Sequence, residues 1–225
     1  MTAAVTRAQH LATAYQDSRE RITALVAPLD DAAQRTPVAA CPKWAVRDVV
    51  AHLYAVADEW ADGRLSGPPT DEHTAAHVAQ YADHTLSDLL ARWSDAAARL
   101  DALATTDGLE PPLGDIACHE HDIRGALGRP GARDSLAVTH TADRLLTMLD
   151  PPIPLRVTVE DGEYISGPDH GDVETSLRTT RFDALRWRTG RRSRRQLAAM
   201  DWTGDPTPLL DHLYLFGPAD ADVIE

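Results

Sequence analysis

The sequence has few aromatic residues, few cysteines and no long apolar run. Aromatic residues make up 5% of the 225, and the two cysteines, Cys41 and Cys118, lie far apart with no CxxC pattern. This cysteine usage excludes a disulfide scaffold and points to a reducing cytoplasm. No stretch approaches the roughly 18 apolar residues that a membrane span needs. The N-terminus carries charges throughout, so we also expect no signal peptide.

The chain also lacks an excess of basic residues. It has 22 Lys and Arg against 35 Asp and Glu, which gives a formal net charge of −13. Binding to a phosphate backbone needs clustered Lys and Arg, so we expect no nucleic-acid partner. With 43% hydrophobic and 25% charged residues the composition is that of a globular protein. The length suits one large or two small domains, in a monomer or a homodimer.

The first two thirds of the chain have apolar residues at helical spacing. Gly128, Pro130 and Gly131 give a strong stop signal after the fourth of these segments. Residues 70–76 are polar and are expected to form a connection. The predicted helices lie within residues 2–35, 45–62, 77–105, 113–127 and 136–149.

A proline cluster at residues 151–154 marks the expected domain boundary. Beyond it the pattern alternates as in strands, and Asp161-Gly162 is typical of a hairpin turn. We therefore predict a mainly α protein with a small α+β unit, divided into domains at 1–150 and 151–225. The predicted strands lie at residues 155–159, 164–165 and 173–180, and short helices at 182–187, 193–200 and 206–215.

Three residues on two predicted helices have the character of metal ligands. Asp115 and His119 are four residues apart, so their side chains project from one face of a helix. His52 lies on or beside the apolar stripe of an earlier helix. Two imidazoles and a carboxylate suit a divalent cation such as zinc and leave a coordination position open, which is typical of a catalytic site. Helical bundles build metal sites from inward residues in this way.

Other histidines compete for such a role. His73 and His77 are also four residues apart, with His84 beyond, but their polar surroundings favour a solvated helix start. In the run from His119 to Asp122, neighbouring side chains diverge by about 100° on a helix, so they cannot all bind one ion. Glu120 and His121 are therefore expected to face solvent or an interface. Asp122 is expected either to hydrogen-bond the ligand His119 or to pair with a nearby arginine.

A set of N-terminal residues has a characteristic order and spacing: Pro42, Trp44, Val46, Asp48, His52, Asp115, His119, Asp122 and Leu127 to Pro130. This order and spacing resemble a known family, the mycothiol-dependent maleylpyruvate isomerases, which belong to the DinB-like group of metalloenzymes. The C-terminal third is similar as well, through Val157 to Gly162, Phe182 to Trp187 and Trp202 to Pro206.

The resemblance implies a DinB-like up-down four-helix bundle and a sterol-carrier-like α+β domain. It places the metal ligands at His52, Asp115 and His119, a donor set that suits zinc, and it implies mycothiol as the thiol cosubstrate. Asp115 stands where the family usually has glutamate. Because aspartate is one methylene shorter, the ion would lie closer to that helix. Asp48 and Asp122 are expected to support the ligands.

The implied chemistry is attack by a thiolate on an electrophilic small molecule, since a metal-bound thiol is deprotonated at neutral pH. Addition, rotation about the new single bond and elimination would isomerise a cis double bond of the maleylpyruvate type. If the adduct is released instead, the enzyme is an S-transferase. The alternative is a non-catalytic protein that binds a metal or a small molecule.

Arginines provide the candidate contacts for an anionic substrate. Arg47, close to His52, is one candidate, although a solvated position on the helix face is the simpler interpretation. The basic run from Arg186 to Arg195 is expected to be a solvated, partly ion-paired surface. Alternatively, one of these arginines clamps a carboxylate in a bidentate pair.

Overall fold

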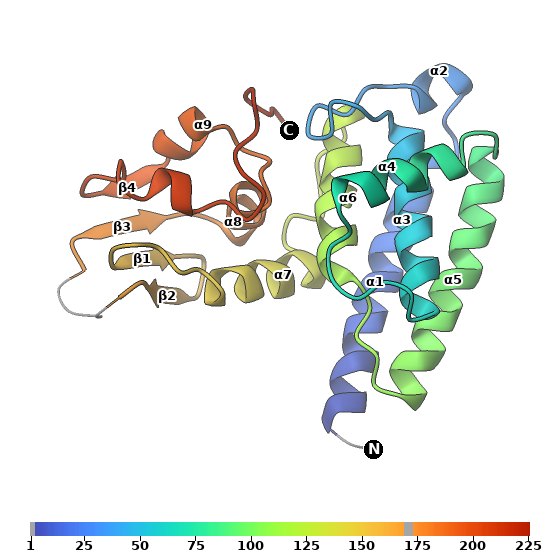
Figure 1. The fold of residues 1–225 in the computed structure, drawn as a ribbon, viewed down its shortest axis with the longest axis horizontal. Helices are drawn as coiled ribbons and strands as arrows, with labels where there is room; N and C mark the ends of the chain where they lie inside the picture. The colour runs from blue at the N-terminus through green and yellow to red at the C-terminus, as the bar shows by residue number, and fades with distance from the viewer. Residues whose placement is uncertain (1–2, 169–172) are drawn as a thin grey trace. The chain divides into compact units, whose positions relative to one another are not determined.

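The computed structural model describes residues 3–168 and 173–225, and it is mainly helical with a small four-stranded sheet, as expected (Figure 1). The chain divides into two compact units, Met1–Gly131 with Glu225 and Ala132–Ile224. This division lies earlier than the boundary expected at residue 150. Helix α7 (Leu136–Thr147) contacts α8 and β2, so it belongs with the sheet and not with the preceding helices.

The N-terminal unit is built from long helices that pack side by side. Helix α3 lies against α5 and α6, and α1 lies against the same two helices (Figure 1). The short helix α4 packs on α3. No helix in the part of the chain that the structure describes is long and apolar enough to cross a membrane. The helices of this unit are α1 (Ala3–Val26), α2 (Asp31–Gln34), α3 (Val46–Ala61), α4 (Asp71–Gln80), α5 (Leu86–Thr106) and α6 (Leu113–Ala126).

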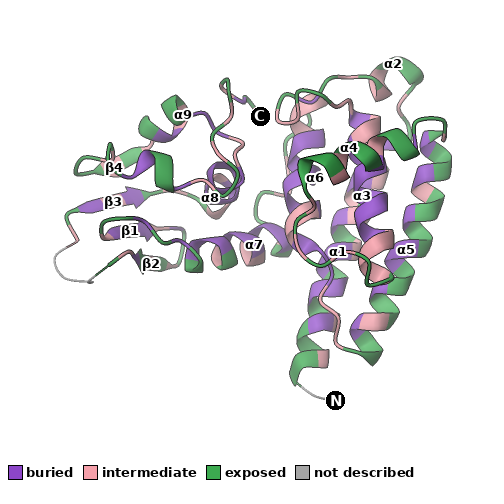
Figure 2. Ribbon diagram, in the orientation of Figure 1, coloured by how far each residue is buried: buried purple, intermediate pink, exposed green. Residues whose placement is uncertain are grey.

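Helix α3 forms the centre of this unit (Figure 2). Every residue from Val49 to Ala57 is buried, because α4, α5 and α6 all pack on this helix. Buried polar groups in such a helix need partners, since an unpaired buried polar group costs about 1–3 kcal/mol. His52 is within this buried stretch, so its ring nitrogens must be satisfied by neighbouring helices.

The single helix predicted over residues 77–105 is wrong. Two helices occupy this region, and residues 70–76 belong largely to α4 instead of forming a connection. Thr70 caps α4 by accepting a hydrogen bond from the backbone N–H of His73. Thr85 and Asp88 form a capping box, with each side chain accepting from the other residue's N–H, and this box starts α5. The capping signals override the continuous apolar period.

The C-terminal unit contains a sheet with strand order β2-β1-β3-β4. Its strands are β1 (Leu155–Thr158), β2 (Glu163–Ser166), β3 (Thr175–Arg178) and β4 (Asp201–Thr203). The predicted hairpin is confirmed, because β1 and β2 pair antiparallel on either side of Asp161-Gly162. Strand β3 pairs parallel to β1, with Leu177 opposite Val157, and both side chains are buried.

Short helices α8 (Arg181–Arg188) and α9 (Arg194–Ala198) agree with the prediction. The helix predicted over 206–215 is wrong, because only a 3₁₀ turn, Leu210–His212, forms there. Strand β4 was missed as well. It is three residues long and is defined by antiparallel pairing with β3, where Trp202 lies opposite Leu177. Such a short strand depends on a partner distant in sequence and leaves no local pattern.

Candidate metal centre

Helices α3 and α6 bring His52, Asp115 and His119 together. One ligand atom from each residue lies within 4.8 Å of the others. Asp115 Oδ1 is 3.3 Å from His52 Nε2 and 3.7 Å from His119 Nε2. The contact between α3 and α6 produces this convergence, since His52 is 63 residues from Asp115 in the sequence.

These separations fit a divalent metal ion. Ligand atoms bound about 2.0–2.2 Å from zinc in a tetrahedral arrangement lie about 3.3–3.6 Å from one another. Of the two Asp115 distances, 3.3 Å lies within this range and 3.7 Å just above it, so the short aspartate side chain reaches the site. The side chains of His52 and His119 are almost fully buried, whereas that of Asp115 is 21% exposed. The Asp115 side is therefore where another ligand can approach.

The ring of His119 is positioned by Asp122, one turn further along α6. Nδ1 of His119 lies 2.8 Å from Oδ2 of Asp122, so a proton on Nδ1 leaves Nε2 as the metal-binding nitrogen. Cys41 donates a weak hydrogen bond to the same carboxylate oxygen at 3.6 Å. Burial lowers the pKa of His119 and outweighs the opposing effect of the two aspartates, which favours the neutral, ligand-competent ring.

The ring of His52 has neighbours on both sides. Its Nδ1 lies 3.3 Å from Nδ1 of His77 on α4. Trp44, in the loop before α3, packs against both ligand rings, with centroid separations of 5.0 Å to His52 and 5.9 Å to His119. These contacts restrict the orientation of both rings. In the sequence Trp44 is part of the motif that carries the resemblance, and this contact with the ligands was not predicted.

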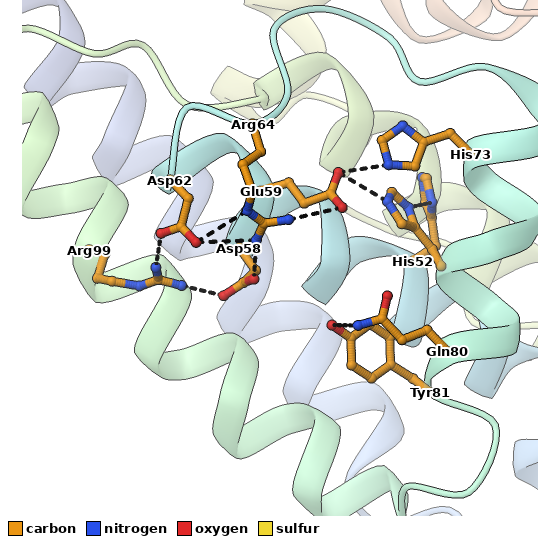
Figure 3. Close-up of polar contacts among 10 residues, drawn as sticks. His52, Asp58, Glu59, Asp62, Arg64, His73, Gln80, Tyr81 and Arg99 are labelled. Atoms are coloured by element: carbon orange, nitrogen blue, oxygen red, sulfur yellow. Dashed lines mark hydrogen bonds and ion pairs between the residues drawn. The ribbon is translucent and has the colours of Figure 1, made fainter.

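A second cluster, Glu59, His73 and His77, lies next to the first (Figure 3). Oε2 of Glu59 is 2.9 Å from Nε2 of His73 and 3.3 Å from Nε2 of His77. The interpretation of His73 and His77 as a solvated helix start is wrong for His77, which is buried. Glu59 was missed, although it lies seven residues after His52 and therefore on the same face of α3.

The pKa values in the second cluster follow from burial and from the neighbouring rings. Burial lowers the pKa of His77, and the nearby His52 adds to this effect. Burial alone would raise the pKa of Glu59, but favourable interactions with His73 and His77 outweigh it, and the net pKa lies below its ordinary value. A charged carboxylate therefore faces a neutral buried imidazole.

Arg47 and Asp48 do not join the site. The Arg47 guanidinium donates to the backbone carbonyls of Tyr81, Ala82 and His84, where it holds the end of α4. This position differs from both the substrate contact and the solvated face considered from the sequence. Asp48 accepts a hydrogen bond from the N–H of Ala45 at 2.9 Å, so it caps α3 instead of supporting a ligand.

Other expectations about charged residues are corrected by burial. Glu120 and His121, expected at a solvated or interfacial position, are buried, and Glu120 forms a bidentate pair with Arg21 of α1. In the basic run of the C-terminal unit, Arg186 and Arg188 are buried instead of solvated. Arg188 donates to the carbonyl of Leu213 at 2.6 Å, so part of this cluster holds the chain together internally.

Two similar solved structures support the fold. Both are crystal structures of the mycothiol-dependent maleylpyruvate isomerase, and one is a histidine-to-alanine mutant. Each is 15% identical to this chain with a TM-score of 0.53, and the matches cover 84% and 85% of this chain and 92% of the other. A search of curated proteins finds no match. At this identity the likeness shows a shared fold.

A family model also matches, and it covers part of the N-terminal unit. The model describes the mycothiol maleylpyruvate isomerase N-terminal domain and matches residues 15–116. That segment includes His52 and Asp115, and His119 follows shortly after it on the same helix. The resemblance drawn from the sequence is thereby confirmed: residues 15–116 match the model of the mycothiol maleylpyruvate isomerase N-terminal domain.

Proposed function

We propose that the protein is a metal-dependent and mycothiol-dependent isomerase that acts on a small molecule with a maleylpyruvate-type cis double bond. The observation that carries the proposal is the convergence of His52, Asp115 and His119 at ligand spacing. The match to the family model supports mycothiol as the cosubstrate. The donor set, two imidazoles and one carboxylate, supports a zinc-type divalent cation.

A divalent ion held by these residues would supply a lowered thiol pKa, and with it a thiolate at neutral pH. The protein's own residues prepare the site for this chemistry. Asp122 holds a proton at Nδ1 of His119, which directs the Nε2 lone pair inward. Trp44 packs against both rings and helps to hold their orientation. The partly exposed Asp115 marks the side from which the thiol enters.

The isomerisation itself is a reversible addition. The thiolate sulfur forms a bond to one alkene carbon, and the electron pair of the double bond moves into the conjugated carbonyl group. Rotation about the resulting single bond follows. Expulsion of the thiolate then restores the double bond in the trans form, so the thiol is regenerated and no oxidant is needed.

A thiol S-transferase is the second candidate function, and the contacts of Arg47 are the observation that supports it. Because that guanidinium is engaged by backbone carbonyls, it does not supply the expected contact for an anionic electrophile. The metal centre and the thiol are the same in both candidates. They differ in whether the adduct eliminates the thiol or leaves as the product. A non-catalytic binding protein would keep the metal and have no thiol-dependent turnover.

We also propose the finer fold assignments that the resemblance implies. The mutual packing of α1, α3, α5 and α6 supports a DinB-like up-down bundle. The sheet with α7, α8 and α9 supports a sterol-carrier-like C-terminal domain. Both assignments agree with the likeness to the isomerase crystal structures along most of the chain.

The test combines metal analysis with a thiol screen. Purified protein should contain one tightly bound divalent ion per chain and convert maleylpyruvate to its trans isomer with mycothiol, but neither with glutathione nor without a thiol. Replacing His52 by alanine should remove the ion and the turnover together. Full turnover by metal-free protein, or by the His52→Ala variant, would contradict the proposal. A stable mycothiol adduct as the product would identify the transferase.

A further inference from the structure

The cluster of Glu59, His73 and His77 repeats the donor set of the first centre on different residues. His73 and His77 lie one turn apart on α4, and Glu59 reaches them from α3 (Figure 3). All three ligand atoms lie within 4.8 Å of one another. The separation of 3.3 Å between Glu59 Oε2 and His77 Nε2 equals the spacing of two ligands on one zinc-type ion.

One nitrogen of this cluster is buried without a hydrogen bond of good geometry among the described residues, namely Nε2 of His77. It lies 3.3 Å from Oε2 of Glu59, which is itself 2.9 Å from Nε2 of His73. The side chain of His77 is 2% exposed, so water does not satisfy its nitrogen. A buried polar atom without a hydrogen bond costs about 1–3 kcal/mol, and an ion bound to Nε2 of His77 would remove that cost.

The charges around Glu59 also favour a cation. Arg64 pairs with Oε1 of Glu59 at 3.2 Å and with Asp58 and Asp62, and Arg99 pairs with the same two aspartates (Figure 3). Three carboxylates against two guanidinium groups leave one net negative charge in this network. Because Arg64 pairs with Oε1, it also orients the Glu59 carboxylate so that Oε2 points toward the two imidazole rings.

We propose that Glu59, His73 and His77 form a second binding site for a divalent zinc-type metal ion, separate from the centre at His52, Asp115 and His119. The His73 side chain is 36% exposed, which gives the ion a route from solvent. Imidazole nitrogens and a carboxylate oxygen favour zinc, cobalt or nickel over calcium or magnesium, which prefer oxygen ligands throughout.

Because His52 contacts His77, binding of an ion at the first centre should weaken the binding of an ion at the second. A neutral imidazole has one N–H, and the two Nδ1 atoms lie 3.3 Å apart. When Nε2 of His52 binds an ion, its proton is on Nδ1 and is donated to Nδ1 of His77. His77 then has its own proton on Nε2, which the second ion must displace, so the second ion binds more weakly. This coupling rests on the proposed first centre, whereas the second site itself does not.

Metal binding to the tag-free, full-length protein tests the second site, with zinc chloride and cobalt chloride as the probes. In Asp115→Asn and His119→Gln variants the first centre is removed, and we expect one zinc to bind at the second site more tightly than in wild type. Adding His73→Gln to either variant should weaken this binding at least ten-fold. His73→Gln alone should leave the tight zinc of the first centre in place.

Circular dichroism confirms that each variant is folded, and the use of two first-centre variants protects the test against misfolding of one of them. The second site is refuted if folded Asp115→Asn protein binds no zinc, or binds it equally well with and without His73. The coupling is refuted if wild-type protein binds two zinc ions with equal affinity. Failure of the proposed function would give a different result, in which the tightly bound zinc ion remains after His119 is replaced.

Discussion

The two histidine clusters of the N-terminal unit contain the same donor types but differ in how those donors are held. In the first cluster, the nitrogens remote from the site face partners, Asp122 for His119 and His77 for His52. In the second, Arg64 holds the carboxylate of Glu59, and the remote nitrogen of His77 faces the ring of His52 instead of a carboxylate. The comparison teaches that the two clusters meet at one contact, between Nδ1 of His52 and Nδ1 of His77, and the coupling proposed above depends on that contact.

The largest expected effect comes from removing a ligand of the first cluster. His119→Ala should lower the zinc affinity of the first centre by more than about 100-fold, because even loss of an outer partner costs about 10–100-fold. Mycothiol-dependent turnover should fall to background. Equilibrium dialysis and an isomerisation assay measure both effects. Retention of a tight ion together with activity would show that the first cluster is not the metal centre.

A smaller effect is expected when Asp122, whose carboxylate faces Nδ1 of His119, is replaced by an amide. Asp122→Asn should lower zinc affinity about 10–100-fold, because the amide no longer fixes the Nδ1–H tautomer. The control is Glu120→Gln on the same helix, where a buried carboxylate pairs with Arg21 and Arg124. This variant should lose unfolding free energy, about 3 kcal/mol, with zinc affinity unchanged. Equal zinc affinities in the Asp122→Asn and Glu120→Gln variants would show that Asp122 does not support the metal ligand His119.

The metal-free protein should lose stability as the pH falls. Both His119 and His77 have a pKa below the ordinary value of 6.5 in the folded state, mainly because of burial. The unfolded chain therefore binds more protons, so stability present above about pH 6.5 decreases as the pH is lowered. Urea unfolding between pH 8 and 5 measures the slope. His77→Gln should flatten it, whereas His10→Gln, at an exposed position on α1, should not.

The smallest expected effect comes from removing the N-terminal cap of α4, which should weaken zinc binding at the second cluster only. Thr70→Ala removes the hydrogen bond to the N–H of His73 and should cost about 1 kcal/mol of stability. Since α4 carries only the second cluster, zinc binding there should weaken while the first centre keeps its affinity. Ser135→Ala, at the cap of α7, removes a similar bond and should leave both centres unchanged. Weakening of the first centre by Thr70→Ala alone would show that α4 supports His52 more strongly than proposed.

The sequence predicted the first cluster well and the second poorly, for reasons that differ between helices. Asp115 and His119 have a regular one-turn spacing, and His52 lies in a strongly apolar helix, so both signals are local. The second cluster depends on α4, whose residues are polar and whose boundaries are set by caps at Thr70 and Thr85. Without α4, His73 and His77 had no packing partner and were interpreted as solvated.

The arginines were difficult for a related reason. Arg47 and Arg188 both donate to backbone carbonyls at segment ends distant in sequence, at Tyr81 to His84 and at Leu213. No pattern of side chains in the sequence predicts such a partner, because any residue has a backbone carbonyl group. Charge patterns therefore predict that an arginine needs an acceptor, but tertiary packing determines which acceptor it finds.

Crystallography with zinc tests the central claim most directly. Crystals grown with one equivalent of zinc should show an anomalous peak at the zinc edge between helices α3 and α6, about 2.0–2.2 Å from Nε2 of His52, Nε2 of His119 and a carboxylate oxygen of Asp115. With zinc in excess, a second, weaker peak should appear between Glu59, His73 and His77. A strong peak elsewhere, with none at His52, Asp115 and His119, would contradict the account.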